Sequence, residues 1–106
     1  MIDLTQIQDK TFDIKVNEKI TLNIRKPNNQ MFKDIAKIIE LIESNAEQDK
    51  LLGFIYMYLT RVFNRNKNDM KFTQTEIENL FDMDVAIYVI REYQSWMNEV
   101  IQDINF

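Results

Sequence analysis

The 106-residue sequence contains no cysteine and no histidine, and it has only one glycine and one proline. Without cysteine there is no disulfide and no thiolate ligand for a metal. Without histidine, Ser-His-Asp and Cys-His catalytic groups and the usual near-neutral proton carrier are excluded. A single glycine argues against nucleotide-binding loops, β-barrels and propellers, which use glycine at their turns. Helices joined by short polar loops are therefore favoured.

Long apolar runs and an excess of basic charge are missing as well. The longest apolar stretch, residues 51–63, is interrupted by polar residues and is shorter than the roughly 18 residues of a membrane-spanning helix. The N-terminus lacks a basic segment followed by an apolar one, so we expect no secretory signal. The net charge of −4 disfavours nucleic acid as a partner, because nucleic acid attracts basic surfaces.

What the sequence does contain is typical of one globular domain over residues 1–106, with 45% hydrophobic and 28% charged residues. Residues 11–25 alternate between apolar and polar side chains, which predicts two half-buried strands. A three-residue loop at 17–19 would place every apolar side chain of this hairpin on one face, against the helices. The expected strand pairs are Val16 with Ile20, Ile14 with Leu22, and Phe12 with Ile24.

After the predicted hairpin, apolar residues recur at helical spacing in two stretches. The first helix is expected after a cap at Asn28 or Asn29 and ends near Ser44. Its expected core stripe is Met31, Ile35, Ile38, Ile39 and Ile42. The second, at about 49–63, is apolar nearly all round and should lie at the centre of the bundle.

Two further helices complete the bundle. Thr73 and Glu76 fit a capping box, which predicts a short helix over about 74–81. The last helix spans about 84–103, with an expected core stripe of Ala86, Ile90, Tyr93, Met97, Ile101 and Ile104. The fold class is therefore α+β, with an N-terminal antiparallel β-hairpin (11–25) packed on a bundle of about four α-helices (29–104).

Residues that could carry chemistry are few. Asp82 and Asp84 could bind a hard cation, but helix capping explains both. We therefore predict no enzyme activity, no metal and no cofactor. The local basic group could contact phosphates or an acidic partner, although a solvated helix end explains it as well. Its members are Arg61, Arg65, Lys67 and Lys71.

The last helix carries a stronger signal for binding. Its apolar side chains cover an arc of roughly 200°, whereas a helix facing one core needs little more than about 100°. Either the helix packs between two others, or its surplus edge meets a partner or a second copy of the chain. Trp and Tyr are frequent interface anchors. The candidate partner-binding residues are Val85, Tyr88, Val89, Trp96 and Val100.

The layout resembles the tail assembly chaperones of long-tailed bacteriophages that infect Gram-positive bacteria. The resemblance is carried by the hairpin at 11–16 and 20–24, by the helix end and basic Asn-rich loop at 59–67, and by residues 72–80 followed by the aromatic segment 93–97. It implies a non-enzymatic factor in the host cytoplasm. Such a factor would bind the tape measure protein and keep it soluble during tail assembly, and the tail tube protein is a second candidate partner.

Two alternatives stay open at this point. One is a phage structural or connector protein, which would be found in purified particles. The other is a small nucleic-acid-binding regulator that uses the basic group, and it predicts steeply salt-dependent binding.

Overall fold

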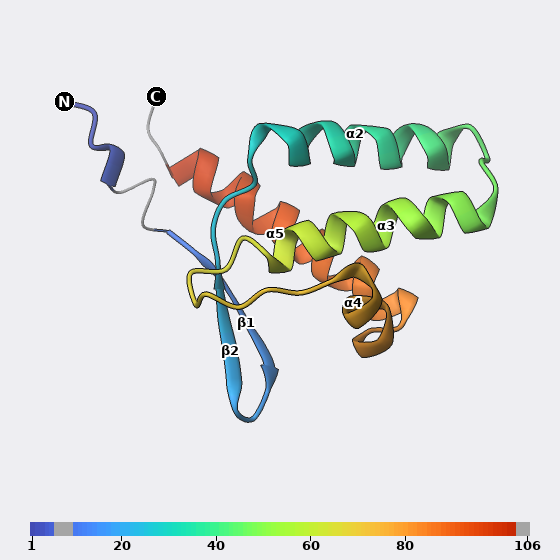
Figure 1. Ribbon diagram of the computed structural model, residues 1–106. Coiled ribbons are helices and arrows are strands. Elements are labelled where there is room, and N and C mark those ends of the chain that lie inside the picture. The colour runs from blue at the N-terminus through green and yellow to red at the C-terminus, as the bar shows by residue number, and fades with distance from the viewer. Residues whose placement is uncertain (6–9, 104–106) are drawn as a thin grey trace.

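A computed structural model of the chain describes residues 1–5 and 10–103 (Figure 1). Its elements are β1 (Phe12–Asn17), β2 (Ile20–Ile24), α2 (Asn29–Glu43), α3 (Gln48–Phe63), α4 (Gln74–Leu80) and α5 (Met83–Asp103). An antiparallel two-stranded hairpin followed by four helices is the α+β arrangement that the sequence predicts. The predicted core position Ile104 lies outside the described residues.

The hairpin differs from the prediction at its turn. Two expected pairs are present: Phe12 with Ile24, and Ile14 with Leu22. The third is wrong, because Asn17 and not Val16 faces Ile20. The Asn17 side-chain oxygen accepts hydrogen bonds from the backbone N–H groups of Lys19 (2.8 Å) and Ile20 (3.0 Å). This closes the turn over two residues and leaves Val16 as the extra residue of a bulge.

Helix α3 lies at the centre of the packing, as its nearly continuous apolar surface predicts. It contacts α2, α4, α5 and β2. Tyr58, Leu59, Val62 and Phe63 in its second half are almost fully buried. In Figure 1, α2 runs antiparallel to α3 along one side. Because β2 also contacts α3, the apolar face of the hairpin closes the same core.

The loop after α3 ties the hairpin to the helices. Asn66 forms an isolated β-bridge with Ile24. The Arg25 N–H donates to the Arg65 carbonyl and the Lys67 N–H donates to the Asn23 carbonyl, each at 2.9 Å. The polar loop expected after α3 is therefore paired with the end of β2.

The start of α4 follows its local sequence. The Thr73 hydroxyl accepts from the Glu76 N–H at 3.2 Å, and the Glu76 carboxylate accepts from the Thr73 N–H at 3.1 Å. This is the predicted capping box. It fixes a seven-residue helix whose Ile77 is fully buried.

The orientation of α2 corrects the sequence prediction. Met31 and Ile38 are buried as expected, but Ile39 and Ile42 are 48% and 55% exposed. The buried face instead includes Asp34, which forms an ion pair with Arg61 of α3. Periodicity alone counts an aspartate as polar and turns it outward. The ion pair places this side of α2 against α3, so the predicted stripe is rotated toward solvent.

Helix α5 changes its buried face near its C-terminal end. Ala86, Ile90 and Tyr93 are buried as predicted. Farther along, Ile101 is 43% exposed and Val100 is only 3% exposed, so the prediction for these two residues is reversed. Beyond Tyr93 the helix packs against β1 through Trp96, and Val100 lies one turn further on the same face.

The molecule is flat and rather extended. Its principal extents are 48 × 36 × 19 Å and its Cα radius of gyration is 14.6 Å. A compact domain of about 100 residues has a radius of gyration of about 13 Å. Within the described residues, no helix combines the length and the apolar character needed to cross a bilayer.

Candidate partner-binding surfaces

The predicted edge of α5 is divided between surface and core. Val85 is 41% exposed and Tyr88 is 63% exposed. Val89 and Trp96 are half-buried and pack against the core, and Val100 is buried. Of the five predicted contact residues, the first two are therefore the most accessible to a partner.

Trp96 belongs to an aromatic cluster where the hairpin meets α5. Its ring stacks on Tyr93, with centroids 5.8 Å apart and ring planes at 16°. Phe12 of β1 lies 5.5 Å from Tyr93 and 5.8 Å from Trp96. Part of the width of the α5 apolar arc is used by packing against α3 and the hairpin, whereas the alternative left open by the sequence was packing between two other helices.

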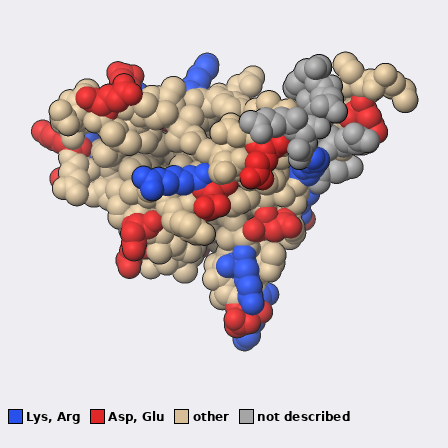
Figure 2. All heavy atoms as spheres, turned by 180° about the vertical axis from the view of Figure 1, so that it is seen from behind, with Lys and Arg blue, Asp and Glu red and all other residues tan. Residues whose placement is uncertain are grey.

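The four basic residues do not form one free patch. The Arg61 guanidinium is paired with the Asp34 carboxylate. The Arg65 guanidinium donates to the Lys26 carbonyl from Nε at 3.0 Å and from Nη2 at 2.8 Å. Of the predicted group, Lys67 and Lys71 are exposed, whereas Arg61 and Arg65 are half-buried. Acidic and basic side chains are interspersed on the face seen in Figure 2. Two members of the group therefore stabilise the fold.

An apolar row on α2 is a surface that the sequence assigned to the core. Four side chains point away from α3 or stand at its edge, and together they are called the outer stripe: Phe32, Ile35, Ile39 and Ile42. Ile35 is half-buried, and the other three are 48–55% exposed. The charged residues Lys37 and Glu40 pair with each other at 3.6 Å on another side of the helix. The stripe is therefore continuous and uncharged.

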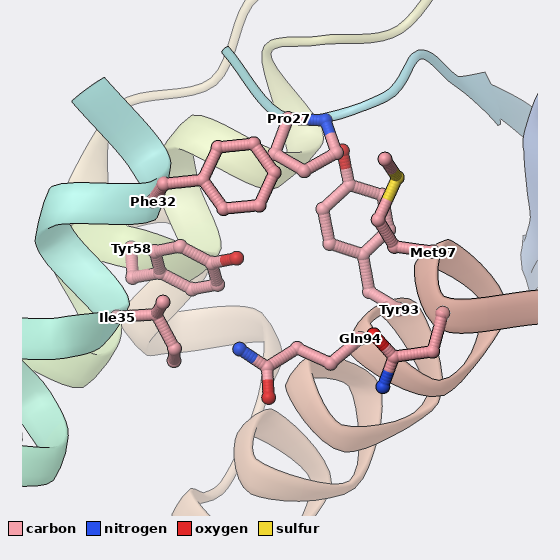
Figure 3. A pocket seen from close by; sticks show the side chains of 8 residues that line it. Pro27, Phe32, Ile35, Tyr58, Tyr93, Gln94 and Met97 are labelled. Carbon is pink, nitrogen blue, oxygen red and sulfur yellow. The ribbon is translucent and has the colours of Figure 1, made fainter. Parts of the chain in front are cut away.

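A groove runs beside this stripe between α2 and α5 (Figure 3). Phe32 and Ile35 of α2 stand on one side of it, and Gln94 and Met97 of α5 stand on the other. The Tyr58 hydroxyl from α3 points into the space between them. The full lining is Pro27, Phe32, Ile35, Tyr58, Tyr93, Gln94, Met97 and Asn98. We refer to it as the α2–α5 groove.

The two tyrosines of the groove remain neutral over the physiological pH range. Burial raises the pKa of Tyr58 to about 12, with a smaller contribution from the Asp34 carboxylate, and a hydrogen bond with Gln94 opposes the shift. Burial also raises the pKa of Tyr93, whose hydroxyl donates to the Arg25 carbonyl. The floor of the groove therefore carries no charge and suits an apolar guest that brings a few polar groups.

The sequence contained a signal for this surface. The apolar residues of α2 cover an arc of about 220° on a helical wheel, which is wider than the arc of α5. That width indicates two contact faces, but it does not say in which direction the neighbouring helix lies. The stripe could therefore have been predicted as an excess apolar face without being located.

Comparison of the chain with protein-family models, with curated proteins and with solved structures finds no match. Among the residues that the structure describes, no group of three or more Asp, Glu, His or Cys side chains could hold a metal ion.

Proposed function

We propose that this protein is a non-enzymatic assembly factor that covers an apolar helical segment of another protein. The observation that carries the proposal is the outer stripe of α2 together with the adjoining groove. Contiguous exposed apolar surface of this kind marks a protein-interaction site. The resemblance to phage tail assembly chaperones supplies the proposed partner, which is the tape measure protein. The tail tube protein is a second proposed partner, and the proposed location is the host cytoplasm.

The elements that surround the groove support a helix as the guest. Its walls come from α2 and α5 and its floor comes from α3, so a further helix lying there would complete a bundle of four. Phe32 and Ile35 are three residues apart and form one apolar wall. Met97 on the opposite wall is unbranched and can adapt to guests of different shape. A long tape measure helix presents apolar side chains in many local arrangements, which a tolerant groove can accept.

The polar groups at the groove support reversible binding. Gln94 and Asn98 stand beside the apolar lining. Surfaces that mix apolar anchors with polar groups are typical of complexes that form and dissociate. A factor that covers its partner only during assembly needs such an interface.

Co-expression with a tape measure segment from the same genome tests the proposal. Wild-type protein should bring the segment into the soluble fraction. Met97→Glu should abolish this effect, because it places a charge in the groove. The matched control is Leu80→Glu on α4, since Leu80 is 56% exposed and lies outside the groove.

The outcomes separate the function from the site. A tape measure segment that stays insoluble with wild-type protein would refute the proposed function. Equal solubilisation by wild type and Met97→Glu would refute the groove as the binding site. In that case Tyr88→Glu tests the predicted α5 edge, because Tyr88 is the most exposed of its residues.

A further inference from the structure

Helix α2 carries more apolar surface than its place in the fold uses. Its buried residues, Met31, Ile38 and Leu41, face inward with Asp34. The outer stripe occupies the adjoining part of an apolar arc of about 220°. A helix that packs on one neighbour needs little more than about 100°. The remaining face is therefore available to a partner outside this fold.

The spacing of the stripe is the same when read from either end. Its residues follow one another at intervals of three, four and three, which is the heptad spacing of helices that pair. Antiparallel pairing about residue 37 would set Phe32 against Ile42 of a second copy and Ile35 against Ile39. Every apolar side chain would then meet another, and the contact would be self-complementary, as a two-fold interface requires. We propose that a second copy of this chain covers the outer stripe and forms a symmetric antiparallel α2–α2 dimer.

The ends of α2 support the antiparallel direction. The first turn of this helix has no acidic residue and its last turn has no basic residue, so neither end of the helix dipole is compensated within the turn. In the proposed pairing, Glu43 at the C-terminal end lies beside the N-terminal turn of the second α2. A carboxylate at that position stabilises the positive end of the dipole. Parallel pairing would instead place the like ends of the two helix dipoles side by side.

The whole chain exposes more area than is typical of a compact monomer of its mass. The chain exposes 7462 Å², although a monomer of 12.8 kDa typically exposes about 6,300 Å². The surplus is therefore about 1,200 Å², and a standard interface buries about 800 Å² on each partner. The exposed segment Met1–Thr5 supplies part of this surplus. Three of the exposed large apolar side chains lie on α2.

The dimer goes beyond the proposed function, and the two can be tested separately. Ile39 and Ile42 belong to the stripe but do not line the groove. Met97 lines the groove but does not belong to the stripe. Phe32 and Ile35 belong to both, so a guest helix and a second copy would compete for them. The dimer would thereby shield the apolar surface until a guest arrives.

Sedimentation equilibrium on the full chain provides the first test. Wild type should be a dimer in the micromolar range. Ile42→Glu should raise the dissociation constant at least about a hundredfold, because both copies lose an apolar contact and gain a charge. Ile42 is 55% exposed, so the fold should be retained, and circular dichroism checks this. Leu80→Glu, at 56% exposure on α4, should remain dimeric. A monomeric wild type, or an Ile42→Glu variant that dimerises as tightly as wild type, would overturn the proposal.

Spin-label distances test the direction of pairing. The chain has no cysteine, so one introduced cysteine carries one label. With a rise of 1.5 Å per residue, labels on Ala36→Cys would lie about 3 Å apart along the helix axis, and labels on Asn29→Cys about 24 Å apart. The Ala36→Cys dimer should therefore give the clearly shorter distance by double electron–electron resonance. Equal distances for both variants, or no coupling between copies, would contradict the antiparallel dimer.

Discussion

Arg61 belongs to the basic group of the sequence, yet its guanidinium pairs with the Asp34 carboxylate, which is only 5% exposed. Arg61→Leu should lower the free energy of unfolding by about 3 kcal/mol, because it leaves a buried carboxylate without its charged partner. The value is at the lower end of the range for buried pairs, since the Arg61 side chain is 41% exposed. Urea denaturation measures the change.

The matched control for this prediction is the double variant Asp34→Leu/Arg61→Leu. Replacing both charges with apolar groups should recover most of the lost stability, because no unpaired charge remains. If Arg61→Leu alone changes stability by less than about 0.5 kcal/mol, the ion pair does not hold α2 in its orientation.

At the scale of single residues, the sequence predicts contacts that are close along the chain. The Thr73–Glu76 capping box spans three residues and was predicted with both partners. The Asp34–Arg61 pair spans 27 residues and was not predicted. Nothing in the local sequence links a helix aspartate to one arginine among several. The same limit applies to the site: Arg61 and Arg65 read as a basic patch until their distant partners are known.

Among the elements, α3 contains the one glycine of the chain in the interior of a helix. Outside its chain neighbours and the nearby backbone of its own helix, a Cβ added at Gly53 would meet no heavy atom within 4 Å. Gly53→Ala should therefore stabilise the protein by about 0.5–1 kcal/mol, because alanine favours the helix and restricts the unfolded chain. The measurement is the midpoint of thermal or urea unfolding. A decrease in stability would mean that the first half of α3 is not helical as described.

The elements also show where prediction from sequence ends. The hairpin face and two of its strand pairs follow from alternation, because a period of two leaves little choice of register. The bulge does not follow from alternation, because it depends on hydrogen bonds that the Asn17 side-chain oxygen accepts from two backbone N–H groups of the turn. For α2 the apolar arc was visible, but its direction was set by a distant ion pair. Three of the four stripe residues, Ile35, Ile39 and Ile42, were consequently assigned to the core, and the groove beside the stripe was not foreseen.

At the scale of the molecule, a buried side-chain amide shapes the loop that connects the end of α3 to the hairpin. Asn66 is 6% exposed. Its amide nitrogen donates to the carbonyls of Phe63 and Met70, each at 2.7 Å. Its side-chain oxygen accepts from the N–H groups of Asn68 at 2.9 Å and Met70 at 3.1 Å. These bonds shape the loop whose backbone pairs with β2.

Asn66→Ala should cost about 3 kcal/mol of unfolding free energy, because several loop groups lose their partners and some are buried. The loss of stability should differ between the elements of the fold. Amide hydrogen exchange should quicken more in β1 and β2 than in α5, since the hairpin is held to α3 through this loop. Asn79→Ala on the exposed side of α4 is the control, and it should leave the unfolding free energy and the amide exchange rates unchanged. If amide exchange accelerates equally in the hairpin and in α5, the two elements open as one unit. The loop would then not be what holds the hairpin to α3.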